Sequence, residues 1–139
     1  MEQSKEDRIQ VVLCEPGKKA RVTTIMNNLE SLQKMVGGYI EAVYPFEDPV
    51  AIVCNEEGKL NGMVLNRALR DESGEVYDII AGPFIVAGLD TENFASLSKE
   101  HQEKYRKLFE HPEIFFRVGE KIHSAPIETT DFTKLPKHR

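Results

Sequence analysis

The sequence has few cysteines and no long apolar run. Only Cys14 and Cys54 are cysteines among its 139 residues, and both lie in short apolar stretches, which is typical of reduced, buried thiols rather than disulfides. No window approaches the roughly 18 to 20 apolar residues that a membrane helix needs. The first residues are charged and do not resemble a secretory signal. We therefore predict a cytoplasmic protein without a membrane partner.

The sequence also lacks an excess of basic residues. It has 18 lysines and arginines against 23 aspartates and glutamates, for a formal net charge of −5. Non-specific binding to DNA or RNA depends on many lysine and arginine contacts to phosphate, so we predict no nucleic-acid polymer as a partner. A single small anion needs only two or three donors and is compatible with this charge.

Motifs for catalysis and metal binding are missing as well. No pair of histidines has the i, i+4 spacing of a helical zinc site, and neither cysteine has a neighbouring cysteine. There is no GxSxG nucleophile motif. Gly37-Gly38 follows a predicted helix instead of preceding one, so it indicates a helix end rather than a phosphate loop. We expect no metal, no cofactor and no catalytic residue of these classes.

Length and composition favour one hydrophobic core. A chain of 139 residues, 40% hydrophobic and 29% charged, fits a single globular domain. We predict an α+β fold with a small, mostly antiparallel sheet packed by two helices. Residues 1–112 form this domain in the prediction, and residues 113–139 form a C-terminal extension or arm.

The strand predictions follow β-rich runs bounded by turn residues. Four strands are expected at residues 9–14, 19–25, 39–44 and 50–54. The first two form a hairpin and the last two pair with each other. Residues 60–69 are ambiguous between helix and strand. Val76–Ile80 and Phe84–Ala87 flank Ala81-Gly82-Pro83 and predict one bent strand.

Two helices are predicted from their capping residues. Asn27 or Asn28 caps a helix over residues 28–36, which Gly37 ends in a left-handed conformation. Ser98 caps a helix over Lys99–Glu110, and His111-Pro112 ends it because the residue before a proline disfavours helical geometry.

The C-terminal region carries one apolar patch, Ile114-Phe115-Phe116. Two interpretations of residues 113–139 stay open: an arm packed on a neighbouring subunit, or a loose tail. The patch is accordingly a candidate contact between subunits, or it folds back on the sheet of its own chain.

Five polar residues are embedded in otherwise apolar stretches and form the candidate ligand site: Tyr39, Glu41, Asn66, Arg67 and Asp78. Arg67 could bind a phosphate or carboxylate, Tyr39 could stack on a ring, and Asn66 or Asp78 could contact polar edges. In the alternative, structural interpretation, Arg67 pairs with Asp78 or Glu41 within the chain, or these side chains point to solvent.

Four segments carry a resemblance to a known family. They are GGYIE at Gly37–Glu41, CNEEGKLNG at Cys54–Gly62, NRAL at Asn66–Leu69 and DIIAGPFIVAG at Asp78–Gly88. Over residues 9–110 the sequence resembles family 3846 of the domains of unknown function, from Gram-positive bacteria, their phages and mobile elements. Met63-Val64-Leu65 departs from the family pattern, which has a proline there, and this puts the loop near Arg67 in doubt.

The resemblance implies a small α+β fold without a settled activity, and its phage context implies a counter-defence role. We expect a homo-oligomer that binds and sequesters a nucleotide-derived, cyclic-nucleotide signalling molecule without chemistry, in the host cytoplasm if phage-encoded. The second hypothesis is a protein-interaction module that inhibits a host defence protein directly. A nucleotide phosphodiesterase or lyase, using His123 or another base, is the third.

Overall fold

The computed structural model describes residues 7–127. In chain order the elements are β1 (Arg8–Cys14), β2 (Arg21–Met26), α1 (Leu29–Val36), β3 (Ile40–Val43), β4 (Val50–Asn55), β5 (Leu65–Arg70), β6 (Val76–Ala81), β7 (Phe84–Leu89), β8 (Phe94–Ala95), α2 (Lys99–Leu108), β9 (Glu113–Val118) and β10 (Lys121–Pro126). A central sheet has the order β2-β1-β7-β4-β3, with β8 paired to β7, and β5–β6 and β9–β10 form two smaller sheets. All pairings are antiparallel, which confirms the predicted α+β class.

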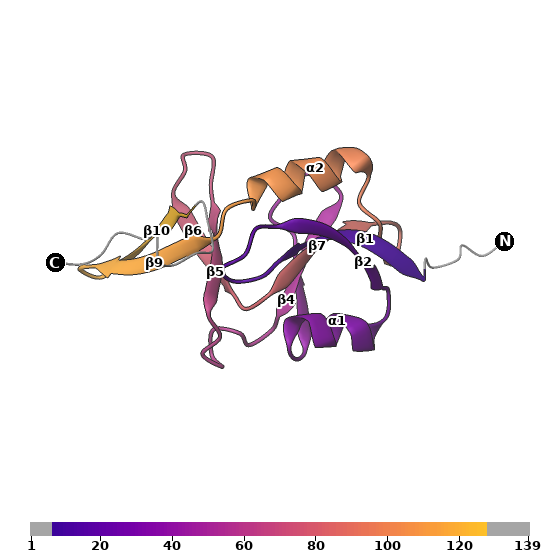
Figure 1. Cartoon of the computed structure of the whole chain (residues 1–139), viewed down its shortest axis with the longest axis horizontal. Helices are drawn as coiled ribbons and strands as arrows, with labels where there is room; N and C mark the ends of the chain where they lie inside the picture. The colour runs from indigo at the N-terminus through magenta and orange to yellow at the C-terminus, as the bar shows by residue number, and fades with distance from the viewer. Residues whose placement is uncertain (1–6, 128–139) are drawn as a thin grey trace.

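The three middle strands of the central sheet, β1, β7 and β4, are buried on both faces. They are nearly continuous apolar runs, as expected for strands covered from two sides. Side chains alternate between the faces along each strand. The residues under α2 include Val12, Ile52 and Val86, and those under α1 include Leu13, Val53 and Ile85. The sheet is therefore the middle of three layers, with one helix on each face (Figure 1).

Both helices are capped by residues that the sequence predicts, and α1 begins one residue later than predicted, at Leu29. The Asn28 carboxamide oxygen accepts a hydrogen bond from the Ser31 N–H at 2.8 Å, and Gly37 ends α1 with a φ of 82°. The Ser98 hydroxyl accepts one from the His101 N–H at 3.1 Å at the start of α2. Within residues 7–127, no helix is long and apolar enough to cross a membrane.

The predicted bent strand over residues 76–87 is wrong. Its first part is β6, which pairs with β5 in a separate sheet, and its second part is β7 in the central sheet. The change of sheet occurs at Gly82, whose φ of 80° is left-handed and therefore favours glycine. A Cβ added to Gly82 would lie 2.7 Å from the Met63 sulfur, so a larger residue would strain the backbone and also require the Met63 side chain to move. Residues 60–69, whose sequence did not distinguish helix from strand, contain most of β5 (Leu65–Arg70).

The chain after residue 112 forms a β-hairpin up to Ile127. The Ile127 N–H donates to the Pro112 carbonyl at 2.7 Å and closes the base of the hairpin. The Glu113 carboxylate accepts from the Ala68 N–H at 3.3 and 3.4 Å, which joins β9 to β5. Residues 113–127 are thus not a loose tail, and residues 128–139 lie outside the described part. An arm on a neighbouring subunit stays a prediction.

Candidate functional site

Two of the five predicted site residues, Asn66 and Arg67, are buried inside the fold. Arg67 has no exposed surface and Asn66 is 1% exposed. The Arg67 guanidinium donates to the carbonyls of Phe109 and Lys18 at 3.1 and 2.7 Å and to the Asn66 side-chain oxygen at 2.7 Å. Asn66 in turn donates to the carbonyls of Cys14 and Gly82 at 3.0 and 2.9 Å. The pair therefore joins β1, the β1–β2 turn, the Gly82 corner and the end of α2.

This arrangement differs from both sequence interpretations of Arg67. Its partners are mostly main-chain carbonyls, not Asp78 or Glu41, and it does not point to solvent. Burial lowers the pKa of the guanidinium, while the nearby Cys14 and Glu113 act in the opposite direction. Carbonyl oxygens satisfy a buried cation when no carboxylate bonds to it. The chemistry of Arg67 is thus used to hold the fold together.

The other three predicted residues lie elsewhere. Tyr39 is 72% exposed. Glu41 and Asp78 line a cleft of about 240 Å³ between β3–β4 and β6. Asp78 forms an ion pair with Lys59 at 2.9 Å in this cleft, whose other charged residues, Glu56 and Glu57, are acidic. The structure therefore brings Glu41 and Asp78 together, away from Asn66 and Arg67, in an acidic cleft that does not favour phosphate.

The two cysteines are free and buried, as predicted. Burial raises the pKa of Cys14 to about 12 and that of Cys54 to about 11. A thiol is nucleophilic as the thiolate, so neither group is activated at neutral pH.

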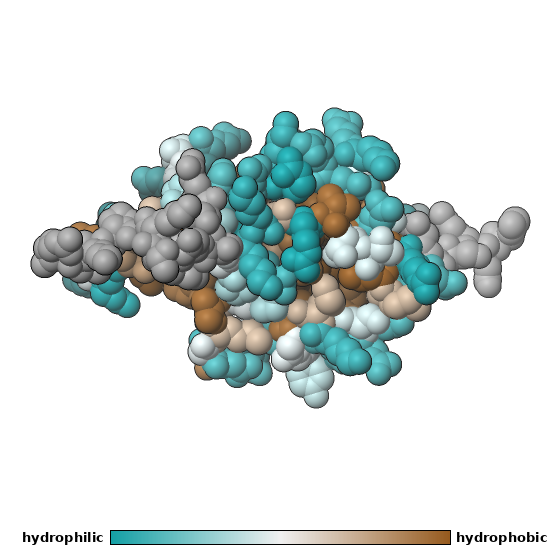
Figure 2. Space-filling model, viewed as in Figure 1, coloured by the Kyte–Doolittle hydropathy of each residue, from teal (hydrophilic) through white to brown (hydrophobic). Residues whose placement is uncertain are grey.

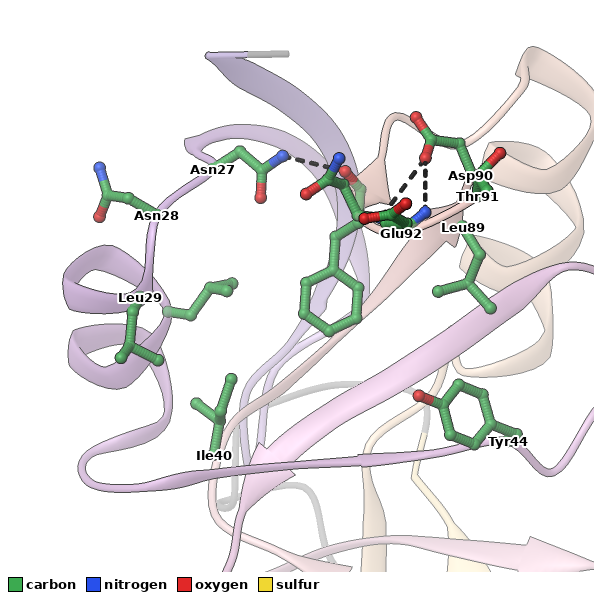
Figure 3. Close-up of a pocket in the computed structure, with 12 residues that line it drawn as sticks. Asn27, Asn28, Leu29, Ile40, Tyr44, Leu89, Asp90, Thr91 and Glu92 are labelled. Carbon is green, nitrogen blue, oxygen red and sulfur yellow. Dashed lines mark hydrogen bonds between the residues drawn. The ribbon is translucent and has the colours of Figure 1, made fainter. Parts of the chain in front are cut away.

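A second cavity, which we call the α1 groove, lies between α1 and the turn after β7. Its volume is about 500 Å³, within the roughly 300–1,000 Å³ typical of small-molecule sites. Residues from the β2–α1 junction, α1, β3 and the β7–β8 turn face one another around it (Figure 3). Ile40 of β3 and Phe94 of β8 are only half-buried there, so α1, with 8 residues, leaves this part of the sheet face uncovered.

The floor of the α1 groove is apolar and its end is aromatic. Leu32 and the half-buried Ile40 and Phe94 belong to the core cluster beneath α1. Tyr44, 63% exposed, stands across the groove from Leu29, and its hydroxyl points inward (Figure 3). An apolar floor beside an exposed ring suits a flat, partly apolar ligand.

The rim is polar and is held by its own hydrogen bonds. The Asp90 carboxylate accepts from the N–H groups of Glu92 and Asn93 at 3.2 and 3.4 Å, which fixes the turn. On the opposite side, the buried Asn27 side chain donates to the Phe94 carbonyl at 2.9 Å. The Asn27 bond joins the β2–α1 junction to β8, and the Asp90 bonds fix the shape of the turn, so the rim is held by the fold itself.

Sequence reasoning missed this groove. It treated Asn27 and Asn28 only as helix caps and Tyr44 only as a strand end. The signal that was available is the polar segment Asp90–Asn93 directly after the apolar β7, since polar residues beyond a buried strand mark an exposed turn. Its closeness to α1 depends on the strand order, which the sequence does not reveal.

Within residues 7–127, no group of three or more histidine, cysteine or acidic side chains is placed to hold a metal ion. The charged residues around the α1 groove are Asp90 and Glu92. The groove can accept hydrogen bonds through these carboxylates and pack against a ring.

A family model described as a domain of unknown function (DUF3846) matches residues 9–110. This range contains the central sheet, the β5–β6 sheet and both helices, and it ends before the β9–β10 hairpin. No curated protein and no solved structure matches the chain.

Proposed function

The chain belongs to the DUF3846 family, and we propose that it binds a nucleotide-derived small molecule in the α1 groove and sequesters it without chemistry. The observation that carries this proposal is the incomplete cover of the sheet by α1. It leaves a groove with an apolar floor, an exposed tyrosine and a polar rim. A nucleobase is flat and has polar edges, so it can stack on such a ring and hydrogen-bond to such a rim.

One observation supports binding without turnover. The groove lining holds no histidine, cysteine or lysine, and of its two carboxylates, which are the general-base types present, Asp90 is already bonded to the N–H groups of its own turn. A sequestering protein needs high affinity, which a preformed site favours. The hydrogen-bonded rim makes the groove such a preformed site.

The biological setting is part of the same proposal. Sequestration of a signalling nucleotide suits the counter-defence role that the family resemblance suggests. Two free, buried thiols are typical of a reducing compartment, so we place this activity in the cytoplasm.

A thermal-shift panel tests the proposal. Adenosine, mononucleotides, cyclic dinucleotides and cyclic ADP-ribose-type molecules are each added to the purified chain. Ligand at a hundredfold above its Kd stabilises a protein by about 2.7 kcal/mol, which raises the Tm of a domain of this size by roughly 5–15 °C. A rise with one class of molecule supports the proposal, and no rise with any class contradicts it.

Two tyrosine variants locate the site. Tyr44→Ala removes the ring at the groove and should abolish the shift. Tyr39→Ala removes the exposed tyrosine that precedes β3, which does not line the groove, and should leave the shift intact. If Tyr39→Ala abolishes the shift and Tyr44→Ala does not, the ligand site lies outside the groove. Recovery of unchanged ligand after heating the complex distinguishes sequestration from a phosphodiesterase or lyase.

A second candidate function, direct binding of another protein, is favoured by the β9–β10 hairpin. Phe116, Val118 and Ile122 are 42–58% exposed on it. In Figure 2 the surface over α2 is mostly hydrophilic, and a strip of hydrophobic surface lies along the lower edge of the molecule near this hairpin. An apolar cavity of about 740 Å³, lined by Phe115, Ile127 and other residues, lies at its base. Exposed apolar patches mark interaction sites, for a host protein or for the homo-oligomer we expect.

The double variant Phe116→Ser, Val118→Ser tests this second function, with Tyr44→Ala as the matched control. Light scattering coupled to size-exclusion chromatography reports self-association, and a pull-down from host extract reports a partner. Loss of either complex in the hairpin variant alone supports the hairpin surface. If both variants form the same complexes as the parent chain, the hairpin is not an interaction surface.

A further inference from the structure

We infer that the α1 groove takes the uncharged base-and-sugar end of its ligand, a nucleoside, and keeps any phosphate outside. This inference rests on the proposed function and specifies which part of a nucleotide the protein recognises. Three features of the groove carry it: the sign of its charge, its hydrogen-bond acceptors and its aromatic end.

The charge of the groove opposes phosphate. Asp90 and Glu92 are acidic, and the lining contains no lysine, arginine or histidine. Phosphate sites in proteins are built from guanidinium or ammonium groups or from N–H groups at a helix N-terminus. At α1 the Asn28 side chain already occupies the Ser31 N–H as the cap. A phosphate in the groove would lie close to two carboxylates without a cation to offset them.

The Glu92 carboxylate suits the donors of a nucleoside. One oxygen of Asp90 serves the N–H groups of the turn. Within residues 7–127, no hydrogen bond occupies the Glu92 carboxylate, whereas the second Asp90 oxygen points away from Tyr44 in Figure 3 and leaves Glu92 as the acceptor for a ligand. Exocyclic amino groups, ring N–H groups and ribose hydroxyls are donors that this acceptor can bind.

The aromatic end of the groove determines how the ligand lies. The Tyr44 hydroxyl points inward, and Asp90 and Glu92 lie on the wall above it (Figure 3). A base packed against the Tyr44 ring and the apolar floor would turn its polar edge toward the Glu92 carboxylate. The 5′ carbon would then point to the open side, where a phosphate remains in water.

Isothermal titration with adenosine and adenosine 5′-monophosphate tests the inference. The parent chain should bind adenosine at least about tenfold more tightly than the monophosphate, and added salt should narrow this difference because it screens the repulsion. Glu92→Lys should narrow or invert the preference. Glu72→Lys, an equal charge change in the exposed β5–β6 turn, should leave it unchanged. Tyr44→Ala should weaken both ligands.

The possible results separate this inference from the function on which it rests. If the monophosphate binds as tightly as adenosine or more tightly, the inference is overturned, whereas nucleotide binding itself stands. If Glu92→Lys does not change the preference for adenosine and Tyr44→Ala does not weaken either ligand, recognition lies outside the groove and the inference is also overturned. If no compound of the wider nucleotide panel binds, the proposed function fails, and the inference fails with it.

Discussion

The two faces of the central sheet are covered to different extents. On one face, α2 buries Tyr105 and Phe109 completely or nearly so, and Phe46 packs its ring against both. On the other face, the shorter α1 buries Leu32 and Val36 and leaves the α1 groove beside them. At the α2 face, Arg67 and Asn66 maintain the fold. At the α1 face, Asn27 and Asp90 also bond within the fold, and the groove that we propose as the ligand site lies beside them. In this account, the extent of cover, more than residue type, decides which polar side chains a ligand can reach.

The largest effect expected is from Arg67→Met at the α2 face. This change leaves the Phe109 and Lys18 carbonyls and the Asn66 side chain without a buried donor, at about 1–3 kcal/mol each. The free energy of unfolding should fall by at least about 3 kcal/mol in urea denaturation. Arg117→Met, at an exposed arginine of β9, is the control and should stay within about 0.5 kcal/mol of the parent. Equal stability of the two variants would mean that Arg67 is not a structural residue.

Truncation of one core residue from each helix region should sharpen the comparison of the two sheet faces. Phe109→Ala removes a ring that packs edge-on against Phe84 at 5.2 Å and should cost about 3–5 kcal/mol. Leu32→Ala should cost less, about 2–3 kcal/mol, because the adjoining groove gives water access to the space it leaves. Urea denaturation of both variants measures the difference, and a larger loss from Leu32→Ala would contradict unequal cover.

A smaller effect is expected where α2 is tied to the loop before β4. The Tyr105 hydroxyl donates to the Asp48 carboxylate at 2.6 Å, and Lys104 pairs with the same oxygen at 2.6 Å. Tyr105→Phe keeps the ring and removes one bond, so it should cost about 1 kcal/mol. Thermal unfolding detects this loss, and an unchanged Tm would show that the hydroxyl contributes nothing.

This contact also predicts a pH dependence. Hydrogen bonds from Lys104 and Tyr105 lower the pKa of Asp48 from its ordinary value of 3.8. Since the folded pKa lies below the unfolded one, the stabilisation is present above about pH 4 and is lost as the pH falls further. The Tm difference between the parent and Asp48→Asn should therefore be largest near neutral pH and shrink toward pH 3. If this Tm difference instead grows as the pH falls, the predicted role of the Asp48 carboxylate is wrong.

The smallest effect on stability is expected at the groove itself. Tyr44→Ala changes an exposed side chain and should alter the free energy of unfolding by no more than about 0.5 kcal/mol. Ligand binding should nevertheless be lost. A large loss of stability in this variant would show that Tyr44 supports the fold.

Local features of the fold could be predicted from the sequence. The caps at Asn28, Gly37 and Ser98 depend on a few neighbouring residues, and the predicted helices agree with the structure within about two residues at each end. The apolar runs of residues 9–14 and 50–54 predicted the strands β1 and β4 for the same reason. By contrast, the division of residues 76–87 between two sheets depends on pairing with β5, β1 and β4, which are distant in the chain.

The candidate site was harder to predict because burial is a tertiary property. Arg67 and Asn66 have the residue types of a ligand site, but their partners Lys18, Cys14 and Phe109 are 42 to 52 residues away in the sequence. Tyr44 and Asp90 attract no attention in the sequence and meet at one groove only after the sheet forms. A polar residue within an apolar run therefore does not show whether it supports the fold or binds a ligand.

Mapping of amide chemical-shift changes by NMR during titration with adenosine tests the central claim most directly. The account predicts changes confined to the β2–α1 junction, α1, β3 with Tyr44 and the turn at Asp90–Asn93, with Asn66 and Arg67 unaffected. Changes centred on Arg67, or on the acidic cleft at Glu41 and Asp78, would contradict the assignment of the α1 groove as the ligand site.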